Sequence, residues 1–399
     1  MTTMYTLSDL DLENLRGTAT LVRVDFNVPL DNGRVLDDTR LRAALPTIEA
    51  LSASGARVAL MSHCGRPQGQ PDARFSLRPV APLLEDLLNR PIAFAEDCIG
   101  DAAATTLQAL EPGGVCLFEN LRFHLGETTN DPNFSAALAA LGAAYVDDAF
   151  GTAHRVHASV VGVAERFDRR AAGHLLINEV VSLTRLLDNP ARPFAALVGG
   201  AKIDTKVDTV RNLLPRLDLL VLGGGMANTF LAAQGHDLSK SLVEQDKIGV
   251  AKEILDAATE LGIQVVLPTD LVVTDDLEKA STVEIFDADA LPPGMMAVDI
   301  GPTSRKSAAE AIAKCQTVLW NGPMGVFERP PFDAGTIAVA DAIADCAGYT
   351  VIGGGETVAA AKGAGVLDRI GHVSTGGGAS LEFLAGKTLP GVAVLERTE

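Results

Sequence analysis

The chain has 399 residues and a formal net charge of −18, with 51 acidic against 33 basic side chains. This charge argues against a nucleic-acid or anionic-lipid partner, since both require a large basic surface. The length exceeds what one hydrophobic core normally organises, so we expect two domains.

No apolar run is long enough to span a membrane, and the acidic N-terminal stretch does not resemble a signal peptide. The five cysteines are odd in number and show no CxxC spacing. We therefore expect a cytoplasmic protein with free thiols and no membrane contact.

Apolar, β-branched runs alternate with amphipathic segments along the whole chain. The predicted strands cover residues 20–26, 57–63, 114–120, 143–150, 194–200, 217–225, 262–268, 317–323 and 349–355. The clearest predicted helices cover residues 40–54, 245–261 and 333–346. Repeated strand and helix predict an α/β fold with two doubly wound, open parallel-sheet domains.

A single helix is predicted over residues 177–193, between the two sets of strands. Its apolar residues recur at helical spacing, and Asp188-Asn189-Pro190 should end it. We expect this segment to be an interdomain hinge helix between domains at residues 1–176 and 194–386.

The first predicted strand continues into the run "VRVDFNVP" (22–29), in which Arg23, Asp25 and Asn27 alternate with apolar residues. Such alternation is typical of a strand with one wet face, but the polar face could instead line a cleft. In parallel sheets, ligands bind beyond the carboxyl ends of the strands. The strand ends of the first half supply arginines and histidines, which predict a cup for a small, multiply charged acid.

Glycine runs follow the strands of the second half, at residues 199–200, 223–225 and 353–355, with another at 376–378. Backbone N–H groups of such turns can approach phosphate oxygens, although tight turns need glycine in any case. Lys202 and Lys206 are four residues apart, so we place them on one face of a helix starting near Ile203. These features favour a nucleotide-phosphate site.

Glu356 lies at a predicted helix N-terminus, where it could complement the helix dipole or bind Mg²⁺. No Ser-His-Asp order, HExxH, metal-type Cys/His cluster or GxGxxG fingerprint occurs, and "LAGKT" (384–388) lacks the first glycine of a P-loop. An acid site in one half and a nucleotide site in the other indicate phosphoryl transfer.

Nine motifs, taken in order, resemble those of the phosphoglycerate kinases along nearly the whole chain. They are "VRVDFNVP" (22–29), "SHCGRP" (62–67), "ENLRF" (119–123), "DDAFGTAHR" (147–155), "GGAKIDTK" (199–206), "GGGMANTF" (223–230), "WNGPMGVFE" (320–328), "GGGETVAA" (353–360) and "HVSTGGGASLEFL" (372–384). The resemblance implies reversible phosphoryl transfer between 1,3-bisphosphoglycerate and Mg·ADP, giving 3-phosphoglycerate and Mg·ATP. It also implies a usually monomeric hinge enzyme whose C-terminal segment, 387–399, joins the N-terminal domain.

The resemblance further implies the residues of each site. Those expected to bind 3-phosphoglycerate are Arg23, Asp25, Phe26, Asn27, Arg40, His63, Cys64, Gly65, Arg66, Arg122 and Arg155. Those expected to bind the nucleotide are Gly200, Lys202, Lys206, Gly224, Ala297, Asn321, Glu328, Gly354, Gly355, Glu356 and Thr357, with Glu356 as the Mg²⁺ ligand. Arg40, Lys202, Gly377 and Gly378 are the expected catalytic residues.

Two positions depart from the family pattern: Glu356 stands where Asp is common, and Ala297 where a glycine usually lines the nucleotide pocket. Both departures bear on affinity and rate rather than on the existence of activity. Two other classes stay open at this point. They are a hinge-type anion-binding protein, which would not need the lysines and glycine turns, and a nucleotide-dependent dehydrogenase, which would need GxGxxG.

Overall fold

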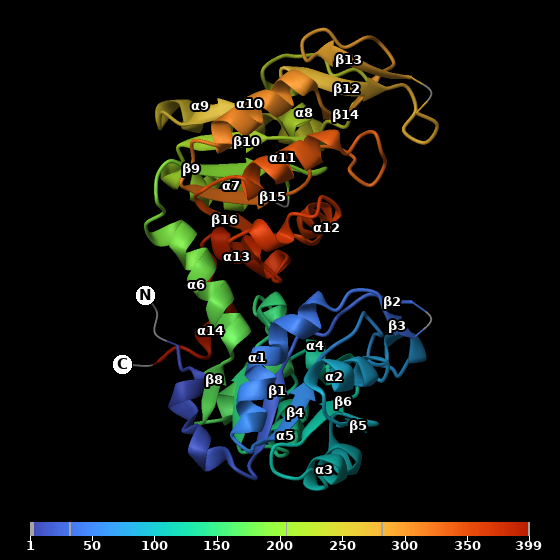
Figure 1. Cartoon of the computed structure of the whole chain (residues 1–399), viewed down its shortest axis with the longest axis vertical. Helices are drawn as coiled ribbons and strands as arrows, with labels where there is room; N and C mark the ends of the chain where they lie inside the picture. Colours follow the sequence, from blue (N-terminus) through green and yellow to red (C-terminus); the bar gives the residue numbers. More distant parts are fainter. Residues whose placement is uncertain (1–3, 32, 205, 281, 398–399) are drawn as a thin grey trace. The chain divides into compact units, whose positions relative to one another are not determined.

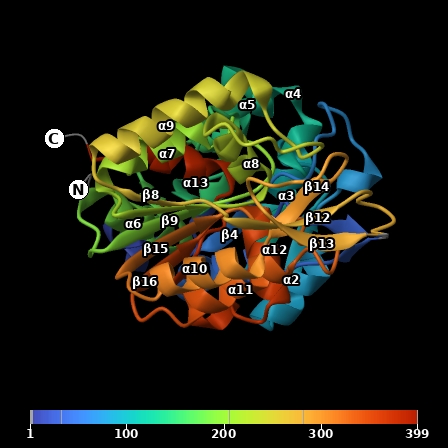
Figure 2. The same cartoon turned by 90° about the horizontal axis from the view of Figure 1, so that it is seen from above.

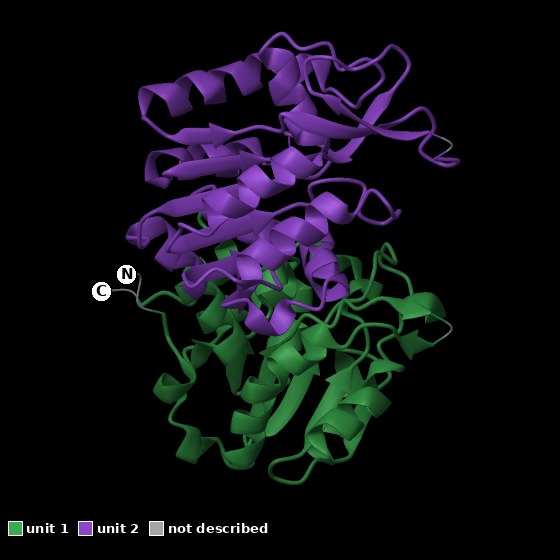
Figure 3. Ribbon diagram, turned by 45° about the horizontal axis from the view of Figure 1, so that its top comes forward, with its two compact units in different colours: residues 1–181, 388–399 green, residues 182–387 purple. Residues whose placement is uncertain are grey.

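The computed structural model describes residues 4–31, 33–204, 206–280 and 282–397. The chain divides into two compact units, an N-terminal unit of residues 1–181 with 388–399 and a C-terminal unit of residues 182–387 (Figure 3). Within the described residues, no helix combines the length and apolar character needed to cross a membrane.

The N-terminal unit is built on a parallel six-stranded sheet in the order β5-β6-β4-β1-β7-β8. Its strands are β1 (Ala19–Arg23), β4 (Arg57–Met61), β5 (Ile92–Ala95), β6 (Val115–Phe118), β7 (Ala144–Asp147) and β8 (Arg170–Ala172). Its α-helices are α1 (Thr39–Ala53), α2 (Val80–Leu88), α3 (Gly100–Gln108), α4 (Leu125–Thr128), α5 (Pro132–Ala139) and α14 (Pro390–Ala393). A short hairpin of β2 (Leu30–Asp31) and β3 (Arg34–Val35) precedes α1.

Both faces of this sheet are covered, as a parallel sheet requires. Val22 packs with Leu41 and Leu84 in one core, so α1 and α2 cover one face, while Leu21 and Ala59 point the other way and are also fully buried. The last residues of the chain complete the unit, since the Tyr5 N–H donates to the Leu395 carbonyl at 2.9 Å.

The C-terminal unit contains a second parallel six-stranded sheet, in the order β11-β10-β9-β15-β16-β17. Its strands are β9 (Phe194–Val198), β10 (Leu219–Leu222), β11 (Gln264–Val266), β15 (Thr317–Asn321), β16 (Tyr349–Ile352) and β17 (His372–Val373). Its helices are α7 (Val207–Leu213), α8 (Gly224–Ala233), α9 (Ile248–Glu260), α10 (Pro302–Ile312), α11 (Ala334–Ala344), α12 (Gly355–Gly363) and α13 (Gly378–Leu384). Helices α7 and α9 lie on one side of this sheet and α10 and α11 on the other (Figure 2).

The predicted fold class is therefore confirmed, and each of the nine predicted strands overlaps an observed one. The observed strands are shorter at their carboxyl ends, because the polar and glycine residues there form turns. The prediction missed an antiparallel sheet of β12 (Asp270–Thr274), β13 (Val283–Asp287) and β14 (Met296–Ile300) (Figure 1). Strand β13 is exposed except at half-buried Phe286, whereas β12 is fully buried and carries the apolar run Leu271-Val272-Val273, which could have indicated it.

Helix α6 (His174–Asp188) occupies the segment predicted as a helix over residues 177–193. It begins before the predicted start, and residues 189–193 lie outside it because Asn189 and Pro190 follow its last residue. The division between the two units falls within this helix, between Val181 and Ser182.

Candidate active site

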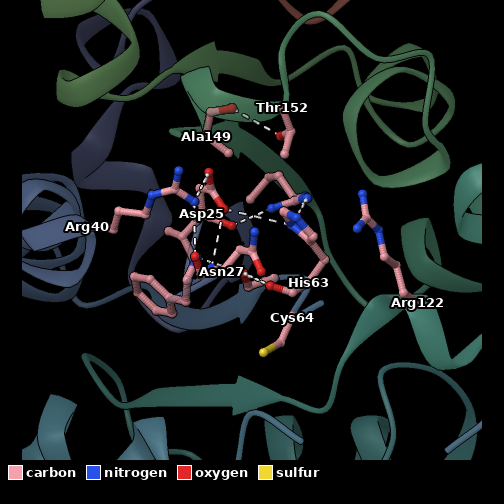
Figure 4. Close-up of polar contacts among 12 residues, drawn as sticks. Asp25, Asn27, Arg40, His63, Cys64, Arg122, Ala149 and Thr152 are labelled. Atoms are coloured by element: carbon pink, nitrogen blue, oxygen red, sulfur yellow. Dashed lines mark hydrogen bonds and ion pairs between the residues drawn. The ribbon is translucent and has the colours of Figure 1, made fainter. Parts of the chain in front are cut away.

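Apart from Arg23, the last residue of β1, and Arg40 in α1, the predicted acid-binding residues of the N-terminal unit come from loops at one edge of its sheet. They follow β1, β4, β6 and β7, whose carboxyl ends meet there because the four strands run parallel. In Figure 4, Arg40 and His63 lie on either side of Asp25.

Asp25 and Asn27 fix the loop that follows β1. Strand β1 ends at Arg23, so the run 24–29 is extended chain rather than strand, yet Val24, Phe26 and Val28 are buried in the core as the alternation predicts. Arg40, in the first turn of α1, donates to Asp25 Oδ2 at 2.9 Å and to the Asn27 carbonyl at 3.1 Å. Asn27 Oδ1 accepts the Gly65 N–H at 2.9 Å.

Arg23 is fully buried, so this position does not face water. Its Nε donates to Ser159 Oγ at 2.8 Å, and Ser159 Oγ donates to Glu127 Oε1 at 2.7 Å. Burial opposes the charge of Glu127, but contacts with His157 and Ser159 and the charge of Arg23 lower its pKa overall. Glu127 and Ser159 were not predicted as partners of Arg23. They are so distant from it in the sequence that no local pattern indicates that they stabilise its buried charge.

His63 is a buried, neutral imidazole. Burial lowers its pKa well below the usual value, and the charges of Arg23, Arg122, Arg155 and Arg40 lower it further. Arg23 Nη2 lies 3.2 Å from His63 Nδ1, and because a guanidinium only donates, Nδ1 accepts and Nε2 carries the proton. The 3.8 Å approach of His63 Nδ1 to Asp25 is therefore not an ion pair.

A basic cavity of about 360 Å³ lies next to this cluster, and three predicted arginines line it. Its lining residues are Arg66, Gln68, Gly69, Arg122, Leu125, Thr128, Arg155 and His157. Burial and the nearby charges of Arg155 and Arg23 lower the pKa of Arg122 to about 10. Its Nη1 donates to the Gly65 carbonyl, but its buried Nε has no hydrogen-bond partner among the described residues. A bound anion would satisfy this donor and relieve the repulsion among the arginines.

Phe26 and Cys64 have buried side chains, so we expect these side chains to support the loops of the site rather than to contact a ligand. The Phe26 N–H donates to Ser62 Oγ at 2.8 Å. Asn120 accepts the Cys64 N–H and donates to its carbonyl, and burial raises the pKa of the Cys64 thiol to about 11. Asn120 was not predicted, although an amide directly after a buried strand could have indicated it.

A cavity of about 240 Å³ lies in the C-terminal unit and is lined by turns and apolar side chains. Five predicted nucleotide-binding residues line it, namely Gly200, Gly224, Ala297, Glu328 and Glu356. Leu271, Val298 and Met324 supply apolar surface to its wall. The other predicted residues do not line this cavity.

The glycine turns beside this cavity interlock. The Gly200 N–H donates to the Pro323 carbonyl at 2.7 Å, and the Gly224 N–H donates to the Met324 carbonyl at 2.9 Å. Gly224 has a φ of +63°, and a Cβ there would lie 2.7 Å from the Gly200 oxygen. These two N–H groups therefore hold the turns together, which corrects the expectation that they point at phosphate.

Lys202 and Lys206 do not share a helix face, which corrects a second prediction. Helix α7 begins at Val207, after a series of turns, and the Ile203 N–H is bound by Glu244 instead of entering a helix. Lys202 is exposed, whereas Lys206 is buried and donates to the carbonyls of Gly199 and Asn321. Burial lowers the pKa of Lys206 to about 8.

The remaining predicted residues lie around the ends of β15, β16 and β17. Asn321 Nδ2 donates to the Gly353 carbonyl at 2.8 Å, and Thr357 Oγ1 accepts the Gly322 N–H at 2.7 Å, so both side chains brace these turns. Gly354 precedes α12 and Gly355 begins it, while Gly377 and Gly378 stand in the same relation to α13.

Fold and site together define an α/β protein with an arginine-lined anion cavity in one unit and a glycine-bordered cavity with apolar walls in the other. A family model described as phosphoglycerate kinase matches residues 7–387. The phosphoglycerate kinase of Moorella thermoacetica is 52% identical over 390 residues, covering 98% of both chains. That of Synechococcus elongatus is 49% identical over 395 residues, again covering 98% of both.

Solved structures agree with these relatives. The phosphoglycerate kinase from Coxiella burnetii is 41% identical with a TM-score of 0.88, covering 98% of this chain and 99% of that one. The phosphoglycerate kinase from Pyrococcus horikoshii is 33% identical with a TM-score of 0.86, covering 98% of each chain. This chain belongs to the phosphoglycerate kinase family.

Proposed function

We propose that this chain catalyses reversible phosphoryl transfer between 1,3-bisphosphoglycerate and ADP, giving 3-phosphoglycerate and ATP in glycolysis. The observation that carries the proposal is the basic cavity of Arg66, Arg122 and Arg155 in a chain of this family. A small acid with a phosphate at one end and a carboxylate at the other fits a site with arginines on both sides of Asp25.

Each part of 3-phosphoglycerate has a candidate partner in the N-terminal unit. Arg66, Arg122 and Arg155 bind the 3-phosphate, because forked guanidinium groups match phosphate oxygens. Asp25 accepts a hydrogen bond from the glycerate hydroxyl, and neutral His63 donates through Nε2. Arg40, already 2.9 Å from Asp25, reaches the carboxylate end.

In the C-terminal unit, the apolar wall of the 240 Å³ cavity takes the adenine ring and exposed Glu328 takes the ribose hydroxyls. Lys206, Asn321 and Thr357 hold the turns around the phosphate tail, with Gly354 and Gly355 at the N-terminus of α12. That terminus favours anions because its N–H groups carry partial positive charge.

Glu356 fits a Mg²⁺ site, since it is exposed in the first turn of α12 and lines the nucleotide cavity. Mg²⁺ needs few carboxylates when substrate phosphates and waters complete its coordination, and it neutralises phosphate charge when bound. We expect Glu356→Asp to retain activity and Glu356→Ala to raise the Mg²⁺ concentration at half-maximal rate. An unchanged Mg²⁺ dependence in the alanine variant, measured at fixed ATP, would remove Glu356 from the metal site.

Catalysis in this proposal is positioning and charge stabilisation, because the substrate carboxylate itself attacks the γ-phosphate in the direction of ADP formation. Arg40 and Lys202 stabilise the charge of the transferring group, and Gly377 and Gly378 offer N–H groups to it. The substrates bind to different units, so we place the closing movement at helix α6, which joins them.

We extend the proposal to a cytoplasmic monomer. All five cysteines are free, which suits a reducing compartment. Sedimentation at working concentration tests the monomer directly, and a stable dimer would overturn this part.

The decisive experiment is a coupled assay with 3-phosphoglycerate, ATP and Mg²⁺. We expect turnover that requires all three components. Binding of 3-phosphoglycerate without turnover would instead favour an anion-binding protein, and binding of NAD would favour a dehydrogenase.

A further inference from the structure

Three side chains with different metal-binding atoms meet at the β5 edge of the N-terminal sheet. Asp97 and Cys98 follow β5, and His124 follows β6 and the short turn Leu121–Phe123. A carboxylate oxygen of Asp97, Sγ of Cys98 and a ring nitrogen of His124 all lie within 4.8 Å of one another. The strands are parallel neighbours, so their carboxyl ends bring these residues together.

The contacts in this group all converge on the Asp97 carboxylate. His124 Nε2 lies 2.7 Å from Asp97 Oδ1, and the Cys98 N–H donates to the same oxygen at 2.6 Å. The ring of His124 stacks on Phe134 at a centroid distance of 5.2 Å, which fixes its orientation. The side chains of Asp97 and His124 are 43% and 31% exposed while Cys98 is buried, so an ion could enter from solvent on one side.

We propose that Asp97, Cys98 and His124 bind one Zn²⁺ ion, with water in the fourth position. Thiolate, imidazole and carboxylate are the ligands that Zn²⁺ takes in proteins, and three protein ligands leave one corner of a tetrahedron open. The thiolate argues against Mg²⁺ and Ca²⁺, which select oxygen ligands. Zn²⁺ would displace the proton between His124 Nε2 and the Asp97 carboxylate and the proton of the Cys98 thiol.

The required movement is small. In a tetrahedral zinc site the ligand atoms lie roughly 3–4 Å apart, as the Zn–N and Zn–S bond lengths dictate. The 2.7 Å separation between His124 Nε2 and Asp97 Oδ1 would widen slightly, and the longest separation would contract from at most 4.8 Å. A surface ion pair accounts for Asp97 and His124, and the buried Cys98 adds Sγ as a third ligand atom within 4.8 Å of the other two.

This site is separate from the proposed catalytic site. None of its three residues lines the basic cavity, although His124 lies two residues after Arg122. Zinc binding can therefore be measured on the whole chain without nucleotide or acid substrate, and its outcome is independent of the phosphoryl-transfer proposal.

The test is a competition titration of the chelator-treated full chain with Zn²⁺ against a chromophoric chelator. We expect one Zn²⁺ per chain, and Cys98→Ser and His124→Gln should each weaken binding at least about tenfold, a loss that even outer-shell changes can produce. Cys346→Ser, which removes a partly exposed thiol of the other unit, is the matched control and should leave affinity unchanged. His124→Gln keeps the test valid if Cys98→Ser fails to fold.

Co²⁺ substitution supplies a second readout. The Co²⁺ form should show a thiolate-to-metal charge-transfer band that Cys98→Ser abolishes and Cys346→Ser retains. The proposal is overturned if the chain binds no Zn²⁺, or if neither Cys98→Ser nor His124→Gln weakens its binding.

Discussion

The two units use the same edge of a parallel sheet in different ways. In the N-terminal unit the strand ends present charged side chains, and two of the arginines, Arg23 and Arg122, are buried. In the C-terminal unit the strand ends present glycine turns that hydrogen-bond to one another. The comparison teaches that the same edge of a parallel sheet can present forked cationic side chains in one unit and interlocked backbone turns in the other.

Their electrostatics differ as well. The arginines near His63 add to burial in lowering its pKa, so the N-terminal site holds excess positive charge. In the C-terminal unit, burial alone lowers the pKa of Lys206, and the nearby charge of Glu356 opposes the shift. The first site thus gathers positive charges, whereas in the second the charge of Glu356 lies near that of Lys206.

The largest effect should come from Lys202, if the C-terminal unit contributes transition-state charge. Lys202→Ala should lower kcat roughly 10²–10³-fold, the usual loss for one stabilising donor, with little change in KM for 3-phosphoglycerate. Lys306→Ala, an exposed lysine of the same unit, is the control. Near-normal kcat in steady-state assays of Lys202→Ala would contradict the assignment.

Removing the buried guanidinium of Arg122 tests whether the arginines of the N-terminal unit bind the acid substrate. Arg122→Ala should raise KM for 3-phosphoglycerate about 10–100-fold, the range for a hydrogen bond to a charged group, and leave KM for ATP unchanged. Arg74→Ala removes an exposed arginine of the same unit and should change neither value. Equal increases in both KM values would mean that Arg122 acts on the fold rather than on the acid.

In the C-terminal unit, the close packing of the glycine turns predicts that an added side chain lowers stability. Gly224→Ala should lower the free energy of unfolding by about 1–3 kcal/mol, because it combines a positive φ with a close backbone contact. Gly249→Ala, in helix α9 with open space around it, should be neutral or stabilising by up to about 1 kcal/mol. Denaturant unfolding measures both, and equal stability of the two variants would show that the turns are not tightly packed.

The lowered pKa of Lys206 predicts that the affinity for ATP depends on pH, whereas the affinity for 3-phosphoglycerate does not. The ammonium form of Lys206 donates to the carbonyls of Gly199 and Asn321 and so holds the turns that we expect around the phosphate tail. Its pKa of about 8 means that this form is lost as pH rises through 8. Affinity for ATP should fall by up to about tenfold between pH 7 and pH 9, and Lys206→Arg should flatten the profile because arginine stays charged. Calorimetric titration at several pH values measures this, and an equal fall for 3-phosphoglycerate would point to a global cause.

Local sequence determined much of the fold and indicated where both candidate sites lie. Buried parallel strands need apolar β-branched runs, so all nine predicted strands were found. Polar or glycine residues of a turn follow each of these strands. The sequence also showed that arginines follow the strands of the first half and glycines those of the second, because each residue lies next to its strand in the chain. The motifs also identified the family, which the comparisons confirm.

Only the tertiary structure decided which groups are buried and what they contact. The burial of Arg23 depends on Ser159 and Glu127, far away in the sequence, and the start of α7 depends on Glu244. The exposed strand β13 exists through pairing with β12, and the meeting of Asp97, Cys98 and His124 requires two adjacent strands. Local alternation predicted the burial of Val24, Phe26 and Val28, but the partners of a buried polar group come from long-range contacts, which no local pattern of residues contains.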